Sequence, residues 1–407
     1  MPADPRSTDT WAPPSLSPYA DAPTAHALRQ EARAALQAQV DAEASAMATA
    51  FAHGSIAVQA DHTHYSDGFA LVLSTPPGVA VAVTRADAAP YLLSVSDDGR
   101  HACTAAEAES GEAPAWAAVT HALQRALGGE SLHVAVASTM PGVCRDSYWA
   151  ALAAALVQAL DTLDMGMPAA VERASDVRDE MLPTVADAVA RVTRRPYSVA
   201  YPIAALAAKP PTFLLMDTAT REHLPVETEA HAALGWALLD TGTAPPRSAE
   251  FHRARHRTAE AALGVLRDGG FDGLSAFRDL EHRDLERAHA AVRDAQKPIV
   301  RHLVTENRRV QKHVASMRQS DWQMIGALLL MSHNSRRTHW GSTSAPIDFV
   351  VETVEGLTID GLYGACMTER DGAVLVTGRP PSFADGLRRL NDAFEDAFDR
   401  PLRMLRV

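Results

Sequence analysis

The stretch Gly54-Ser55-Ile56-Ala57-Val58-Gln59-Ala60-Asp61-His62-Thr63-His64-Tyr65-Ser66-Asp67-Gly68-Phe69 decides the fold of this chain. Its first seven residues are mostly apolar and predict a strand. The polar segment 61–67 predicts a turn, and residues 68–73 predict a return strand.

Around this stretch, the first half of the chain predicts strands with helices packed over them. The expected helices are Thr24 to Phe51, Trp116 to Leu127, and Tyr148 to Leu163. The last of these is so apolar that it should be buried nearly all round. The further expected strands are Val79 to Val83, Tyr91 to Val95, and Leu132 to Ala137.

The second half begins at the break Pro210-Pro211. Strands are expected at Phe213 to Met216, Leu234 to Leu239 and within Gly361 to Val376, and helices over most of Glu250 to Arg318. A helix from Ser320 to Ser332 has Ser320 as its expected N-cap. Another begins at Ala345-Pro346, with one face formed by Ile347, Val350, Val351 and Val354.

The composition limits the class of protein. The chain has 407 residues, 47% of them hydrophobic, without an apolar run of membrane-spanning length, so no membrane partner is expected. A formal charge of -12 argues against a nucleic-acid partner. Residues 1–23 predict a disordered leader and not a secretory signal. Three scattered cysteines, Cys103, Cys144 and Cys366, suit a reducing cytoplasm.

Several segments in chain order resemble the galactokinase family of the GHMP kinase superfamily. Residues 54–69 resemble its signature G-R-V-N-L-I-G-E-H-T-D-Y-N-G-G-F. The later segments that match its motifs are Phe213 to Asp217, Leu239 to Gly242, Val304 to Val310, Leu328 to Ser335, Ser344 to Asp348, and Gly364 to Thr368.

The resemblance implies an α+β, two-lobed GHMP kinase fold with its active site in the cleft between the lobes. The N-terminal lobe, residues 24–210, would be like domain 2 of ribosomal protein S5, and the C-terminal lobe, residues 211–407, would be ferredoxin-like.

The family's phosphate-binding loop, P-x-G-x-G-L-S-S-S, is degenerate here. The matching residues are Pro141, Gly142, Val143, Cys144, Arg145, Asp146, Ser147, Tyr148 and Trp149. Val143 and Arg145 replace two glycines that let backbone N–H groups approach the phosphates. The family's second glycine cluster is also lost, and Glu369 to Gly372 predicts a plain charged hairpin turn.

The family's catalytic positions have changed as well. Ser55 stands where the resemblance places the catalytic arginine, and a serine offers only a neutral hydrogen bond. Tyr201 stands in place of the catalytic aspartate, and a tyrosine with an ordinary pKa of about 10 is a poor base at neutral pH.

The residues that match the family's sugar-binding positions have changed less. Asp61 and His62 match the family's sugar-binding acid and histidine, and His64 replaces a later aspartate. The family's sugar-side tyrosine falls near Phe251 or His252. An alternative interpretation of Asp61, His62 and His64 is a Zn²⁺ site, but no further ligand cluster is visible, and a capped turn with exposed imidazoles is favoured over the metal.

Three hypotheses for function remain. The favoured one is a sugar-binding or regulatory pseudokinase, with a sugar or a partner protein as its ligand and no cofactor. The second is an active ATP-dependent galactokinase or related sugar kinase that uses Mg-ATP. The third is a different enzyme that reuses the cleft through His62, His64 or Tyr201. The basic run Arg253 to Arg257 could bind a phosphate or an acidic partner, but a solvated helix face is the favoured interpretation.

Overall fold

Strand β2 (Phe69–Arg85) organises the first of two sheets. The computed structural model describes residues 24–40, 46–87, 89–96, 99–110, 113–128, 131–165, 174–368 and 370–405, so the expected leader 1–23 lies outside the described residues. One edge of β2 pairs antiparallel with β1 (Ala48–Gln59). Its other edge pairs with β6 (Phe213–Asp217) and then with β5 (Leu132–Ser138).

Three more strands complete this seven-stranded sheet, whose order is β4-β3-β5-β2-β6-β7, with β1 on β2. They are β3 (Tyr91–Ser96), β4 (Gly99–Thr104) and β7 (His223–Pro225). The hairpin expected from residues 54–73 is confirmed, because β1 and β2 pair across the turn at 61–67.

Two expectations for this region are wrong. The helix expected over Thr24 to Phe51 is only α1 (Ala25–Gln39), and Ala48 to Phe51 start β1. These residues pair with the valine-rich part of β2, and sheet pairing overrides the helical preference of alanine. The two strands expected at 68–73 and 79–83 are one strand, because Pro76 and Pro77 lie in a bulge where no ladder N–H is needed.

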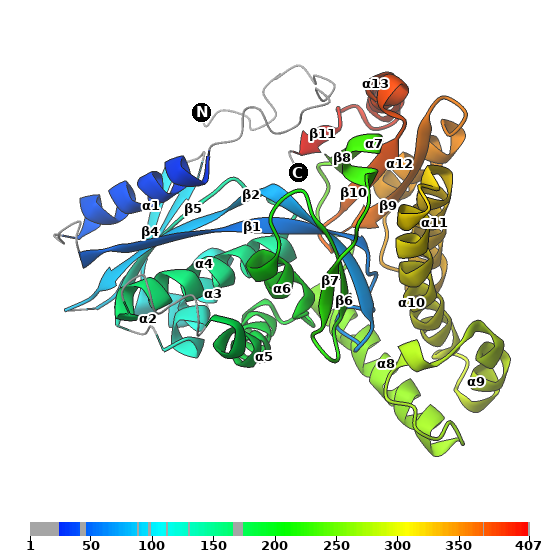
Figure 1. Cartoon of the computed structure of the whole chain (residues 1–407), viewed down its shortest axis with the longest axis horizontal. Helices are drawn as coiled ribbons and strands as arrows, with labels where there is room; N and C mark the ends of the chain where they lie inside the picture. Colours follow the sequence, from blue (N-terminus) through cyan, green and yellow to red (C-terminus); the bar gives the residue numbers. More distant parts are fainter. Residues whose placement is uncertain are drawn as a thin grey trace.

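Helices cover both faces of the first sheet (Figure 1). The helices α2 (Ala105–Glu109), α3 (Ala115–Ala126), α4 (Arg145–Met165), α5 (Ala174–Thr193) and α6 (Ala200–Ala207) lie on the side opposite α1. Residues 149–157 of α4 are all buried, which confirms the expectation for this apolar helix. Packing on both faces explains why the central strands β2 and β5 are buried almost throughout.

The second sheet is antiparallel, in the order β11-β8-β10-β9. Its strands are β8 (Gly235–Asp240), β9 (Leu362–Thr368), β10 (Ala373–Gly378) and β11 (Arg403–Leu405). α7 (Ala230–Ala233) precedes β8, and α12 (Ala345–Gly356) and α13 (Pro380–Phe398) share an apolar core with the sheet. The four residues expected on one face of α12 are all buried in that core.

The remaining helices form the outer edge of the molecule (Figure 1). They are α8 (Ala249–Asp268), η2 (Phe277–Asp279), η3 (His282–Asp284), α9 (Leu285–Ala291), α10 (Lys297–Arg318), α11 (Trp322–Ser335) and η4 (Arg336–Trp340). Ser320 is not the N-cap of α11. It has a φ of 56°, and the Asp321 side chain accepts the hydrogen bond from Met324 N instead.

An apolar cluster joins the two sheets through α10 and α11. The Thr368 hydroxyl at the end of β9 donates to Ala57 O of β1 (2.7 Å), so the sheets also share a direct hydrogen bond. The predicted α+β class is confirmed. The boundary between residues 210 and 211 stays a prediction, since β6 and β7 beyond it extend the first sheet.

Candidate functional site

The first half of the turn 61–67 is buried beside the helices α10 and α11, whereas Asp67 at its far end is exposed. Asp61, His62 and His64 are all buried in it. His62 has a φ of 63°, which turns the chain sharply after β1. Asn307 of α10 fixes the far end of the turn, because its Oδ1 accepts from Phe69 N (2.8 Å). The structure therefore brings the three expected sugar-binding residues together, but away from solvent.

Asp61 is bound by an arginine of the same chain. Arg336 donates from Nε to Asp61 Oδ2 (2.9 Å) and from Nη2 to Oδ1, which makes the contact bidentate. Burial raises the pKa of Asp61 to about 6, against the lowering effect of Arg336. The carboxylate that the family uses for a sugar hydroxyl is thus held by a guanidinium here.

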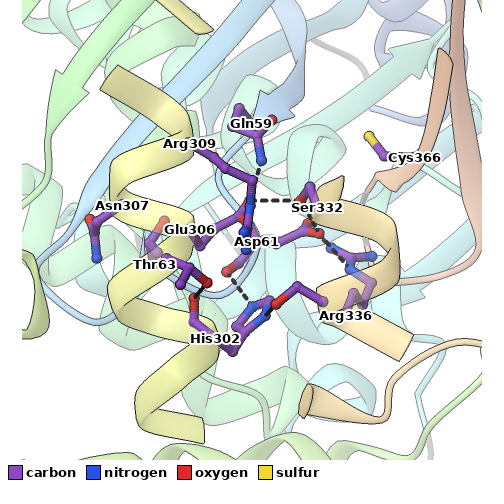
Figure 2. A network of polar contacts seen from close by, with 12 residues as sticks. Gln59, Asp61, Thr63, His302, Glu306, Asn307, Arg309, Ser332, Arg336 and Cys366 are labelled. Carbon is purple, nitrogen blue, oxygen red and sulfur yellow. Dashed lines mark hydrogen bonds and ion pairs between the residues drawn. The ribbon is translucent and has the colours of Figure 1, made fainter. Parts of the chain in front are cut away.

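A second buried carboxylate, Glu306 of α10, lies beside Asp61 (Figure 2). Ser332 Oγ lies 3.1 Å from Asp61 Oδ2 and 2.8 Å from Glu306 Oε1, and its one proton cannot serve both. Glu306 also accepts from Arg309 Nε (2.7 Å) and from Gln59 Nε2. Burial alone would raise the pKa of Glu306, but Arg309 holds it below its ordinary value.

His302 connects α10 to the same network (Figure 2). Its Nε2 lies 3.0 Å from Asp61 O and its Nδ1 lies 3.0 Å from Ser335 Oγ. A carbonyl oxygen only accepts, so Nε2 donates and Nδ1 accepts from the serine. Burial lowers the pKa of His302 to about 3, which keeps this tautomer neutral.

His62 is packed against an aromatic side chain. Its ring stacks on Trp340, with centroids 4.2 Å apart and planes 12° from parallel. Its Nδ1 lies 2.5 Å from the Tyr65 hydroxyl and its Nε2 lies 3.3 Å from Ser342 Oγ. Burial and then Arg336 lower its pKa well below the ordinary value. Both ring nitrogens of His62 therefore already have protein partners.

His64 and Tyr201 meet edge to face, with ring centroids 5.6 Å apart. His64 donates from Nδ1 to Ala60 O (2.5 Å), and burial lowers its pKa to about 4. Tyr201 of α6, expected at the position of the family's aspartate, is buried in the apolar core that α6 shares with α4. The structure thus places Tyr201 near the turn, as a packed aromatic side chain.

The degenerate loop 141–147 leads into α4 and packs against β1. Ser147 Oγ accepts a hydrogen bond from Ser55 N (2.7 Å). The remaining serine of the loop thus binds the residue that is expected in place of the family's arginine. Val143 packs against the apolar cluster between the sheets. Arg145 is exposed and folds back to Gly142 O (3.3 Å). Pro141 is half-buried at the start of this turn.

Asp146, in the first turn of α4, forms a buried ion pair with Arg370. Arg370 donates from Nε to Oδ2 and from Nη2 to Oδ1, each at 2.7 Å, and the two side chains are 3% and 5% exposed. Its Nη1 donates to Pro196 O (2.6 Å). Burial would raise the pKa of Asp146, but Arg370 holds it below its ordinary value.

The hairpin turn after β9 is therefore not the plain charged turn that the sequence predicted. Glu369 lies outside the described residues, but Arg370 and Asp371 are both buried. Asp371 accepts from Arg195 Nη1 (2.9 Å). Two ion pairs thus join this turn to the first lobe, because Asp146 and Arg195 offer partners that lie about 175 to 225 residues away in sequence.

His252 of α8 is a neighbour of His62 whose ring nitrogens, like Nε1 of Trp340, lack hydrogen-bond partners in the described structure. Its ring centroid lies 5.9 Å from that of His62, and its side chain is buried. Neither ring nitrogen has a hydrogen-bond partner among the described residues. Burial and then Arg370 lower its pKa to about 3, so the ring is a neutral imidazole with one unused donor and one unused acceptor.

Sequence reasoning assigned no role to Arg336, Glu306, His302 or Ser332. Glu306 and Ser332 lie within segments that resemble the family, which was a usable signal. Nothing in the sequence indicated a role for Arg336, because only the fold brings it to Asp61. In the parts of the chain that the structure describes, no group of three or more His, Cys, Asp or Glu side chains is arranged to hold a metal. No described helix is long and apolar enough to span a membrane.

Comparison with known proteins gives a consistent set of relatives. No family model matches the chain. It is 28% identical over 368 residues to a galactokinase of Streptomyces coelicolor, covering 85% of this chain and 87% of the relative. It is also 28% identical over 189 residues to a galactokinase of Thermotoga neapolitana, covering 46% of this chain and 50% of the relative.

Solved structures give the same result for the fold. A Lactococcus lactis galactokinase complexed with galactose superposes with a TM-score of 0.76 at 16% identity, over 93% of this chain and 96% of that one. A mevalonate kinase of L. major in complex with R-mevalonate gives 0.52 at 12% identity, over 84% and 91%.

Proposed function

Since the chain is a galactokinase-like protein with the two-lobed GHMP kinase fold, we propose that it is a pseudokinase that acts by binding and transfers no phosphoryl group. The observation that carries the proposal is the buried ion pair between Asp146 and Arg370. It links the two segments that in the family would be glycine-rich and would surround a nucleotide.

A triphosphate at the start of α4 would have to displace this pair. The helix N-terminus favours an anion, and the carboxylate of Asp146 already lies there with Arg370 as its counter-ion. Separating a buried pair costs about 3–5 kcal/mol, which corresponds to a loss of roughly 10²- to 10³-fold or more in affinity. The residues present therefore do not fit Mg-ATP, and we derive no catalytic step through it.

The positions of the catalytic groups support the same proposal. Ser55 is buried and its backbone N–H is bound to Ser147. Tyr201 is buried against His64, and the nearest later carboxylate, Asp217 at the end of β6, pairs with Arg278. A missing charge-stabilising group or base each costs a factor of about 10² to 10⁴ in rate.

A second candidate function is carbohydrate binding within the closed cleft, and His252 favours it. A sugar hydroxyl both donates and accepts, so two hydroxyls would supply the partners that its ring nitrogens lack. Asp61, His62 and His64 would then lie around the ligand, as the resemblance implied. Binding would need Arg336 to share Asp61 with the sugar.

Calorimetry and a coupled ADP-release assay test the proposal. We expect no heat of binding from Mg-ATP or a non-hydrolysable ATP analogue, and no ADP release when galactose and Mg-ATP are added together at millimolar concentrations. The Streptomyces coelicolor galactokinase serves as the positive control.

Two variants test whether the ion pair between Asp146 and Arg370 is what prevents nucleotide binding. The double variant Asp146→Ser with Arg370→Gly removes the buried ion pair and should bind the ATP analogue measurably. Arg389→Ala, which removes an exposed ion pair, should not. Sugar-dependent ADP release by the wild-type protein would refute the pseudokinase proposal. Galactose binding that is lost in His252→Phe would support the second candidate.

A further inference from the structure

A solvent-open cavity of about 410 Å³ lies on the surface of the helical region at the outer edge of the molecule. Its lining residues come from η3, α9 and α10: His282, Arg283, Leu285, Glu286, His289 and Arg301. This volume is within the range of small-molecule sites, about 300–1,000 Å³. His282 and His289 look like ordinary helix-surface histidines in the sequence, and only the fold brings them to one cavity.

The charged groups at this cavity favour an anion. Arg301 has no ion-pair partner within the described residues. Arg283 is paired only with the exposed Glu281, at 3.3 Å, so most of its guanidinium faces water. The pKa of His289 is lowered by its partial burial and then by Arg301, and the pKa of His339 is lowered in the same way. An anion beside Arg301 would relieve this electrostatic repulsion.

The neutral and acidic groups of the lining further restrict the chemical class of ligand that fits this cavity. The Nε2 atom of His289 is buried and has no hydrogen-bond partner in the described structure. The carboxylate of Glu286 lies in the same lining and repels a simple anion, but it accepts hydrogen bonds from hydroxyl groups. Leu285 supplies the apolar part of the wall.

We propose that this cavity binds a small phosphate monoester with free hydroxyl groups, such as a sugar phosphate. Arg301 and Arg283 hold the phosphate, since a guanidinium fork matches phosphate oxygens bidentately. Glu286 and His289 hold hydroxyl groups of the same ligand. The site is separate from the cleft, and it stands whether or not the cleft transfers a phosphoryl group.

Calorimetry with the full-length protein tests the site, with glucose 6-phosphate as the probe. We expect binding with a dissociation constant between about 10 μM and 1 mM, in the ordinary range for exposed metabolite sites. Inorganic phosphate should bind at least about tenfold more weakly and glucose not measurably, since each lacks half of the contacts.

Variants of exposed side chains give the matched comparison. Arg301→Gln should weaken glucose 6-phosphate at least about tenfold, and Arg308→Gln, on the same helix but paired with Gln311, should not change it. Glu286→Gln should reduce the preference for glucose 6-phosphate over inorganic phosphate. Thermal melts of each variant exclude unfolding as the cause.

No binding of glucose 6-phosphate by the wild-type protein would overturn the proposal. Equal affinity for inorganic phosphate would overturn it too, because the site would then be an anion site without hydroxyl recognition. Affinity unchanged in Arg301→Gln would place the ligand elsewhere. None of these outcomes bears on nucleotide binding at the cleft, so this proposal and the pseudokinase proposal fail separately.

Discussion

Replacing Arg370 with alanine should destabilise the protein by about 3–5 kcal/mol, since it leaves the buried Asp146 carboxylate without its counter-ion. The guanidinium makes two hydrogen bonds of 2.7 Å to that carboxylate and a third to Pro196 O. The two bonds to Asp146 are buried, so solvent cannot replace what the substitution removes there.

The double variant Asp146→Leu with Arg370→Met provides the sharper test. Apolar side chains of similar volume often replace a buried pair without loss, so its free energy of unfolding should lie within about 2 kcal/mol of the wild type. Each single variant should be clearly less stable than the double variant. That pattern gives a coupling energy of about 2 kcal/mol or more between the two positions.

Urea unfolding, followed by far-UV circular dichroism and by tryptophan fluorescence, measures these free energies. The exposed pair of Arg389 and Asp360, with side chains 48% and 44% exposed, is the control. Arg389→Ala should change stability by no more than about 1 kcal/mol. If Arg370→Ala changes the free energy of unfolding as little as this control, the ion pair with Asp146 contributes little to stability. A nucleotide could then displace it at low cost, which would refute the reasoning against nucleotide binding.

Three further predictions concern the cores and the buried histidines. Gly326→Ala should destabilise by about 1–3 kcal/mol or more, because a Cβ there would lie 2.2 Å from Tyr363 O, whereas Gly264→Ala, with no atom within 4 Å, should stabilise by up to about 1 kcal/mol in the same urea assay. Trp340→Ala should cost about 3–5 kcal/mol by removing the stacking partner of His62, and a loss below 1 kcal/mol would contradict the packing described. Acid should unfold the protein between about pH 6.5 and 4, because burial lowers the pKa of several histidines that the unfolded chain protonates at their ordinary value. Each contributes stability that falls by up to about 1.4 kcal/mol per pH unit as the pH drops through this window, while Asp61, whose pKa is raised to about 6, opposes them weakly. The histidines are His64, with a pKa of about 4, and His252, His302 and His313, each with a pKa of about 3. Urea midpoints that stay constant from pH 7 to pH 5 would show that these side chains are accessible to protons in the folded state.

Local patterns in the sequence were enough for several elements. The apolar run of α4 and the single apolar face of α12 are periodic, and periodicity depends only on neighbouring residues. The hairpin at residues 54–73 was readable for the same reason. Where the local signal was ambiguous, as at Ala48 to Phe51, the valine-rich partner strand decided the outcome.

The candidate site residues could be recognised in the sequence because a known motif includes them. Their hydrogen-bond partners could not be recognised. Asp61, His62 and His64 were recognisable from the resemblance, but nothing in the sequence indicated that Arg336, Tyr65 and Ala60 would bind them. The loss of the glycines around residues 143 and 370 was visible, but it could not show that Asp146 and Arg370, which lie in these two segments, pair with each other.

The amino-acid sequence by itself determined the α+β class and the likeness to galactokinases, and it predicted the loss of the family's glycine-rich loops and catalytic side chains. Only the tertiary structure decided that Arg370 fills this region by pairing with Asp146, and that His282, His289 and Arg301 share a cavity. The physical reason is that a buried charge requires a partner, and chain folding selects that partner by position in space, from residues whose separation in sequence carries no signal.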